Sequence, residues 1–110
     1  MNNLTIIGRL GAEPVVRTTK ETIVARISLG VNHKKDNVEE TEWFEVILWN
    51  NLASVVQQYY HTGDKVYVKG HLSSSSYEDK EGVTHYVTQI VADDIEKLST
   101  AKRNIQEQSK

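Results

Sequence analysis

The chain has 110 residues, a formal net charge of −2 and no cysteine. This length suits one domain with a single modest core, and the lack of cysteine excludes disulfides and thiolate metal sites. The near-neutral charge argues against a polycation that coats nucleic acid, but it permits a localised basic face. No apolar run reaches the length of a membrane span, and the N-terminus lacks a basic segment followed by an apolar core. We therefore expect a cytoplasmic protein with no membrane partner.

The first half of the chain alternates apolar and polar residues with period two, which predicts β-strands. The predicted strands cover residues 3–11, 22–31 and 41–50, and a short extended segment covers 15–18. Gly8 inside the first strand suggests a bend or a bulge. The polar segment 32–40 has no tight-turn signature, so we expect a mobile loop there.

The second half opens with a predicted helix. Apolar residues recur at helical spacing from residue 52 to 60, where Asn50 or Asn51 can act as the N-cap and Gly63 can end the helix. The stripe consists of Leu52, Val55, Val56, Tyr59 and Tyr60. We expect both tyrosines of this stripe to pack in the core.

Two strands and a polar tail complete the chain. The strands are expected at 65–73 and 83–91, and the loop that connects them at 74–82. The loop ends in a plausible turn over residues 79–82. Ile95 and Leu98 can still dock on the domain, whereas residues 99–110 form a short polar tail that is expected to fray.

Three strands, one helix and two further strands, in this order, match the OB-fold. This all-β fold is a five-stranded Greek-key barrel, here with one helix between the third and fourth long strands. We therefore predict an OB-fold domain over residues 1–98 and a separate tail over 99–110. Closure of the barrel would remove the exposed edges of such short strands.

The third long strand holds both tryptophans of the chain. Alternation places Phe44, Val46 and Leu48 toward the core, so the opposite set faces outward. That outer set is Trp43, Glu45, Ile47 and Trp49. About 20 Å of strand separates the two indoles, which suits separate stacking platforms along an extended ligand. Alternation alone leaves ligand contact and burial in the barrel or in a subunit interface equally open, because a bulge would turn one ring inward.

A ligand with phosphates would also need cationic side chains on the tryptophan side of the barrel. Isolated Lys and Arg are usually solvated surface residues, so this role requires several of them together. The candidates are Arg9, Arg17, Arg26, Lys34, Lys35, Lys65, Lys69 and Lys80. Arg9 and Arg26 lie opposite the apolar sets of their strands, and Lys34 with Lys35 on the mobile loop would close over the ligand.

The remaining tyrosines differ in their surroundings. Tyr77 lies in a polar loop without any periodicity that would bury it, which favours a stacking role. Tyr67 alternates with inward valines, so it either stacks or sits in an interface. Tyr86 is interpreted as structural.

Catalysis and metal binding find no support in the sequence. The four histidines lack metal-ligand spacing, and the serine run 73–76 has no glycine-elbow context. Neither a phosphate-loop nor a dinucleotide fingerprint occurs. We therefore predict a protein that is not an enzyme and that needs no metal or cofactor.

The chain contains an ordered series of short motifs: GRLGAEPVVR at 8–17, TEW at 41–43, NLA at 51–53, YYHTG at 59–63, VYVKGHL at 66–72 and YVT at 86–88. Over residues 2–98, this series resembles the bacterial single-stranded DNA-binding protein family. The resemblance implies sequence-tolerant binding of single-stranded DNA, usually by a homotetramer, in replication, recombination and repair. By position, Trp43, Trp49 and Tyr77 match the family's base-stacking aromatics, and Arg9 and Arg17 match basic positions.

The chain departs from this family pattern in several places. Residues 31–35 carry no aromatic ring beyond His33, the serine run 73–76 replaces arginines and lysines, and Glu45 stands where a neutral or basic residue is common. The sequence ends in QEQSK, without the acidic tip through which the family recruits partner enzymes. These differences imply a short, divergent member with reduced DNA affinity.

The sequence leaves two other functions open. An OB-fold accessory of the replication or restart machinery would keep the fold, bind replication or repair proteins and bind DNA only weakly. An oligosaccharide-binding OB module would also present exposed aromatics, although the basic positions favour DNA. The resemblance further implies a homo-oligomer, most often a tetramer, in which apolar residues around Ile7 and Ile47 would be buried.

Overall fold

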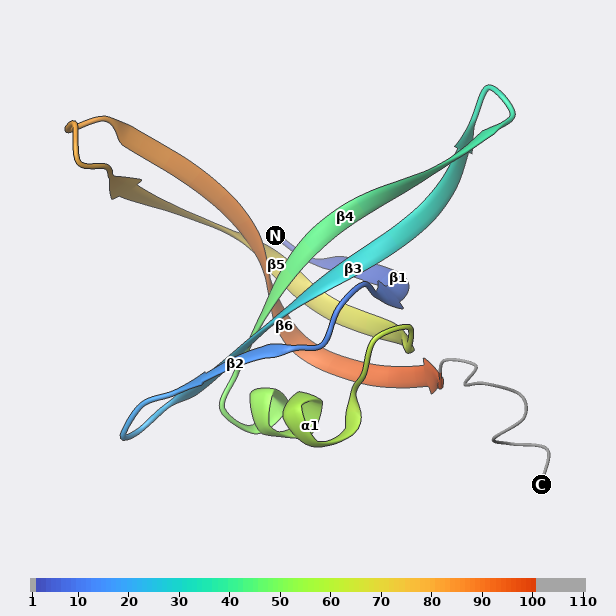
Figure 1. Cartoon of the computed structure of the whole chain (residues 1–110), viewed down its shortest axis with the longest axis horizontal. Helices are drawn as coiled ribbons and strands as arrows, with labels where there is room; N and C mark the ends of the chain where they lie inside the picture. The colour runs from blue at the N-terminus through green and yellow to red at the C-terminus, as the bar shows by residue number, and fades with distance from the viewer. Residues whose placement is uncertain (1, 101–110) are drawn as a thin grey trace.

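Six strands and one helix make up the computed structural model, which describes residues 2–100 (Figure 1). In chain order, the elements are β1 (Leu4–Leu10), β2 (Val15–Thr18), β3 (Ile23–Lys35), β4 (Val38–Trp49), α1 (Asn51–Tyr59), β5 (Lys65–Glu78) and β6 (Thr84–Ser99). Every predicted strand is present, and the helix follows β4 as expected. Within the described residues, no helix is long and apolar enough to cross a membrane. Most of the predicted tail, residues 101–110, lies outside the described part of the chain.

The strands form one sheet in the order β1-β5-β6-β4-β3-β2, and a further pairing between β1 and β3 closes it into a barrel. Residues 9–10 of β1 pair with 29–30 of β3, whereas β2 pairs with 23–26 of the same strand. β1 and β2 therefore act as one long strand that is bent at residues 11–14. The closed ring has five strands, so the predicted OB-fold is confirmed, with β2 as a short extension.

Period-two alternation along the strands fills the interior of the barrel. The buried core consists of Leu10, Ala25, Ile27, Leu29, Val46, Leu48, Ala53, Val56, Tyr60, Val66, Val68, Ile90, Ala92 and Ile95. The predicted inward positions Val46 and Leu48 are fully buried, and Phe44 packs at the margin of this core. The opposite face of β4 is therefore free to carry function.

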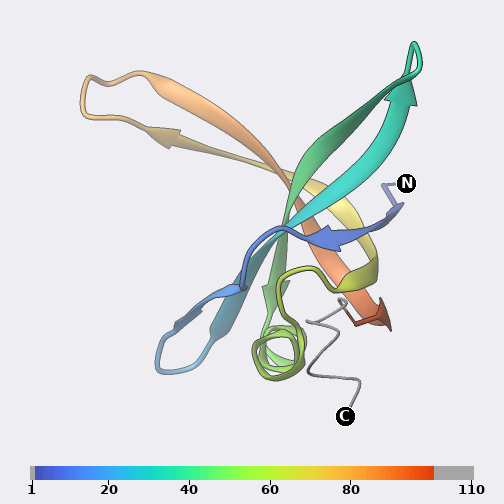
Figure 2. The ribbon, with the colours of Figure 1, turned by 45° about the vertical axis from the view of Figure 1, so that its right-hand side comes forward.

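β3 and β4 continue beyond the barrel as a hairpin, here called the β3–β4 arm (residues 31–42; Figure 2). The predicted mobile loop over 32–40 is wrong, because the two strands stay paired as far as Lys35 opposite Val38. Asp36 and Asn37 form the turn, with φ of 53° and 67°. Positive φ at both central residues is typical of a type I′ hairpin turn, and Asp and Asn tolerate it well.

β5 and β6 form a second hairpin, the β5–β6 arm (residues 72–88), and both arms leave the barrel at the end opposite α1 (Figure 2). The predicted turn at its tip is confirmed, since the Gly82 amide donates to the Asp79 carbonyl at 3.0 Å. The loop expected over 74–78 is wrong, because β5 remains paired with β6 up to Glu78 opposite Thr84. Serines are compatible with this two-stranded ribbon because both of its faces are exposed to solvent.

β6 runs past its expected end to Ser99 and forms the wall that contacts β5 and β4. Ile95 is buried on this extension, as predicted, whereas Leu98 stays about half exposed. The docking prediction is therefore right for Ile95 and wrong for Leu98.

α1 covers the end of the barrel opposite the arms (Figure 1). Ala53 and Val56 are buried against the core, and Tyr60 follows them just after the helix. Val55 and Tyr59 are exposed, so the prediction that both belong to the buried stripe is wrong. A helix of nine residues lying across a barrel end buries only a narrow strip of its surface.

The ends of α1 also differ from the sequence expectation. Asn50 precedes the helix but makes no side-chain cap, and its Oδ1 instead accepts a hydrogen bond from the Ile23 amide at 3.3 Å. The helix ends at Tyr59, before Gly63, whose positive φ of 89° belongs to the turn into β5. The Gly63 amide donates to the Leu10 carbonyl at 2.7 Å, so this turn is attached to the end of β1.

Candidate nucleic-acid interface

The two tryptophans and two arginines share one outer surface. Directly paired residues of neighbouring strands point to the same side of a sheet. The register therefore places Arg9 of β1 and Trp43 of β4 in one row across Gly30 of β3. It places Arg17 of β2 and Trp49 of β4 in another row. We call the surface between these two rows, over β1 to β4, the tryptophan face.

Trp43 lies flat on the barrel because two glycines make room for it. A Cβ atom on Gly11 would lie 2.5 Å from the indole Cζ3 atom, and one on Gly30 would lie 2.9 Å from the same atom. Both separations are shorter than carbon atoms tolerate. Trp43 nevertheless remains 59% exposed, so much of its indole ring is available to a ligand.

A hollow of about 490 Å³ opens beside Trp43. Arg9 and Lys65 line it and are directly paired across β1 and β5. Arg9 Nη1 donates to the Gly63 carbonyl at 2.9 Å, which orients the guanidinium group. The structure thus places two cations, Arg9 and Lys65, next to the indole. The sequence pattern did not distinguish Lys65 from the other surface lysines.

Trp49 ends β4 and is 48% exposed. Arg17 of the neighbouring β2 lines a smaller hollow of about 160 Å³ in the same region, together with Arg26 and Ile47. Ile47 was predicted to face outward with the tryptophans, but it is buried. Its position on the outer side of β4 is right, because it is paired directly with Arg26 of β3.

Arg26 and Glu45 form an ion pair in the middle of the tryptophan face. Arg26 Nη1 lies 3.2 Å from Glu45 Oε2. The other carboxylate oxygen, Oε1, accepts a hydrogen bond from Gln89 Nε2 of β6 at 3.3 Å. Arg26 is therefore in the predicted place, but its charge already has a partner.

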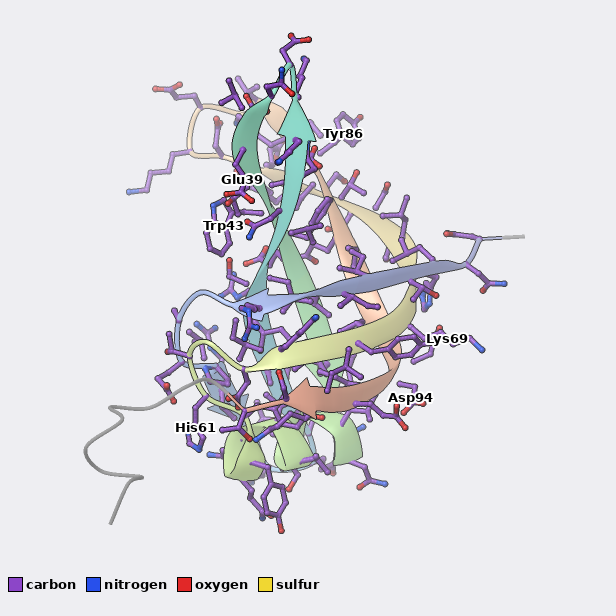
Figure 3. The ribbon with its side chains drawn as sticks, turned by 90° about the vertical axis from the view of Figure 1, so that its right-hand side faces the viewer. Glu39, Trp43, His61, Lys69, Tyr86 and Asp94 are labelled. Carbon is purple, nitrogen blue, oxygen red and sulfur yellow. The ribbon has the colours of Figure 1, made fainter. Side chains whose placement is uncertain are left out.

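Three predicted lysines lie away from this centre. Lys34 and Lys35 are near the tip of the β3–β4 arm, where Lys34 is paired directly with Glu39. Lys69 of β5 is paired with Asp94 of β6, and Figure 3 shows Lys69 and Trp43 on opposite sides of the barrel. The fold consequently gathers Arg9, Arg17 and Arg26, but not these lysines, around the tryptophans.

Tyr77 is carried by the β5–β6 arm rather than by a loop. It is 56% exposed and stacks on His85, its direct partner in β6, with ring centroids 5.1 Å apart. His85 Nε2 lies 2.8 Å from Asp79 Oδ2. The hydrogen bond to His85, followed by that from the Val83 amide, lowers the pKa of Asp79. The ring is therefore held in a fixed orientation.

Tyr86 lies on the other side of the same arm, opposite Ser76. It is 81% exposed, so its interpretation as a structural residue is wrong. His85 and Tyr86 are exposed aromatic side chains to which the sequence argument gave no binding role. Recognition of residues 72–88 as a hairpin would have found them, because the register then places His85 beside Tyr77.

An apolar hollow of about 470 Å³ lies at the base of the arms. Its lining includes Leu4, Phe44, Leu72 and Trp43. Trp43 thus lines both the cationic hollow and the apolar one. Across residues 2–100, no group of three or more His, Asp or Glu side chains is arranged to hold a metal ion.

Comparison with known proteins agrees with this architecture. The family model described as "Single-strand binding protein family" matches residues 1–98. A single-stranded DNA-binding protein of Bacteroides thetaiotaomicron is 32% identical over 112 residues, which cover 94% of this chain and 70% of the relative. Single-stranded DNA-binding protein 1 of Streptococcus pyogenes serotype M6 is 35% identical over 111 residues, covering 96% of this chain and 84% of that protein.

The fold also matches a solved structure. The chain described as "Plasmodium falciparum SSB complex with ssDNA" superposes with a TM-score of 0.80 at 24% identity, over 90% of this chain and 96% of that one. This likeness supports the OB-fold. The family match and the relatives show that the chain belongs to the single-strand binding protein family.

Proposed function

We propose that this protein binds and protects single-stranded DNA without sequence preference, during replication, recombination and repair. The observation that carries the proposal is the tryptophan face, where two half-exposed indoles on one rigid strand lie next to Arg9 and Arg17. The activity is binding rather than catalysis. Membership of the single-strand binding protein family supports it.

The indoles supply the part of the affinity that does not depend on sequence. Stacking of a base on an aromatic side chain contributes about 1–3 kcal/mol, and every base offers a flat π-face. Trp43 and Trp49 are about 20 Å apart along β4, so they stack different nucleotides of one extended strand. Tyr77, fixed on the β5–β6 arm by His85, provides a third platform.

The cations hold the phosphates between and around these platforms. Arg9 and Lys65 serve the strand at Trp43, and Arg17 serves it at Trp49. Each phosphate that a cation neutralises releases counterions, which makes affinity fall with salt. Arg26, Lys34, Lys35 and Lys69 contribute more weakly, because each lies beside or opposite a carboxylate or away from the indoles.

The proposed assembly is a homo-oligomer, with a tetramer as the expected form. Half-exposed Ile7 on β1 lies directly opposite Tyr67 on β5 and also lines the hollow beside Trp43, so the proposed subunit contact adjoins the tryptophan face. Burial of Ile7 between subunits would remove apolar surface from water. The protein would act in the cytoplasm at the nucleoid and recruit replication or repair proteins from there.

A titration with oligo-dT tests the proposed function. At low salt, addition of the oligonucleotide should strongly quench the intrinsic tryptophan fluorescence, and the midpoint should move to higher concentration as salt increases. Mass measurement in parallel reports the oligomer. Unchanged fluorescence at low salt, combined with unchanged anisotropy of a labelled oligo-dT, would refute DNA binding through this face.

A further inference from the structure

Glu45 occupies the centre of the proposed DNA path. Its direct partner on β3 is Ser28, and the row on one side holds Gly30 and Trp43. On the other side, the neighbouring row pairs Arg26 with Ile47, and the row after it pairs Val24 with Trp49. A nucleic-acid strand that runs from one indole to the other therefore passes this carboxylate.

The carboxylate is held in place by both of its oxygens. Oε2 faces Arg26 Nη1 at 3.2 Å, from β3 on one side. Oε1 accepts from Gln89 Nε2 at 3.3 Å, from β6 on the other side. β4 carries Glu45 between these two strands, so the position is defined by the barrel and not by a flexible segment.

The ion pair makes Arg26 less available to contact DNA phosphate than the other arginines of the face. Arg26 satisfies its charge on Glu45, and Glu45 in turn repels any phosphate that approaches Arg26. The side chains are 47% and 43% exposed. Exposed ion pairs of this kind contribute little to stability, so phosphate and carboxylate compete for the guanidinium group on nearly equal terms.

We propose that Glu45 is an affinity-setting residue that competes intramolecularly with DNA phosphate for Arg26. The inference rests on the proposed function and adds a mechanism to it. The centre of the tryptophan face is electrostatically neutral, while its two ends, at Arg9 and Arg17, are cationic. The protein consequently makes fewer phosphate contacts than its arginines allow, and its binding depends more on stacking and less on salt.

The test compares Glu45→Gln with the unchanged protein in a salt series with labelled oligo-dT. The amide keeps the size of the side chain but frees Arg26. We expect roughly two- to fivefold tighter binding at low salt. The plot of log affinity against log salt should become steeper by about 0.7, the value for one additional phosphate contact on a single strand.

Two further variants separate competition from a general loss of negative charge. In an Arg26→Gln background, Glu45→Gln should no longer steepen the salt dependence, because no cation is released. Asp36→Asn removes the same charge at the exposed turn of the β3–β4 arm, where Asn also tolerates the positive φ, and should change neither slope nor affinity. Thermal unfolding of each variant confirms that the fold is retained.

The outcomes distinguish the two proposals. If the unchanged protein binds oligo-dT but Glu45→Gln has the same slope of log affinity against log salt, the role of Glu45 is overturned. The proposed function then still stands. A steeper slope that persists without Arg26 also overturns competition. If none of the variants binds oligo-dT, both proposals fail.

Discussion

The indole of Trp43 lies directly over the backbone of Gly30, its paired residue on β3. A Cβ atom at Gly30 would come within 2.9 Å of the indole Cζ3 atom. The indole therefore occupies the space that a side chain at position 30 would need. This contact decides the angle at which the indole is offered to a ligand.

Gly30→Ala should tilt or lift the indole of Trp43, because the β3 backbone cannot move without disturbing the barrel. We expect a shifted tryptophan emission spectrum and about three- to tenfold weaker oligo-dT binding, a part of the stacking energy of one base. Fluorescence and titration measure the two effects. In a Trp43→Leu background the glycine substitution should have little further effect on affinity, and a loss of similar size there would contradict the contact.

Trp43→Ala and Trp49→Ala should each weaken oligo-dT binding by about 1–3 kcal/mol, since each removes one stacking platform. Anisotropy of a labelled oligonucleotide measures this without relying on the lost fluorophore. Tyr59→Ala is the matched control. That ring is 60% exposed, close to the 59% of Trp43, but it lies on α1 at the barrel end away from the tryptophan face. Equal losses in all three variants would argue against specific stacking.

Glu13 should make stability depend on acid pH. Its carboxylate accepts hydrogen bonds from the Thr62 amide at 2.8 Å and the Thr62 hydroxyl at 2.9 Å, and His61 Nδ1 lies at 3.1 Å. The backbone hydrogen bond from Thr62, followed by the side-chain hydrogen bond with His61, lowers the pKa of Glu13 from 4.5 to about 2. These contacts join the bend between β1 and β2 to the turn that follows α1.

Because the folded pKa is depressed, the stabilisation from Glu13 is fully present above pH 4.5 and disappears as the pH falls toward 2. Between pH 5 and about pH 2.5, the melting temperature of the unchanged protein should fall further than that of Glu13→Gln, because the amide does not titrate there. If the melting temperatures of the two proteins fell equally with pH, the carboxylate would not stabilise the fold.

The Tyr77 platform should depend on Asp79 and His85. The pKa of Asp79 lies below its ordinary 3.8, so its contribution to the arm is present above that pH and is lost as the carboxylate protonates on further acidification. At neutral pH, Asp79→Asn should weaken the hydrogen bonds that Oδ1 accepts from the Glu81 and Val83 amides, and so loosen the stacked pair. Faster amide hydrogen exchange at the tip of the β5–β6 arm would report this, with exchange in β1 as the unaffected reference.

The order of the elements and the direction of most strand residues follow from local pattern. Alternation over Val46 and Leu48 is strict enough to identify the inner side of β4, because one buried face demands period two. The same pattern sends both indoles outward. The expectation failed where a strand has no buried face: in the two arms, both sides of the ribbon meet solvent, so polar residues 32–40 and 74–78 looked like loops.

Tertiary context alone decided which outward residues form a site. Trp43, Arg9 and Lys65 lie far apart in the chain, and only barrel closure through the β1–β3 pairing brings them around one hollow. Burial of Ile47 and the pairing of Arg26 with Glu45 likewise depend on neighbours from other strands. A strand's own sequence encodes which way its side chains point, because that is backbone geometry. What they meet there depends on register between strands, which arises only when the sheet closes.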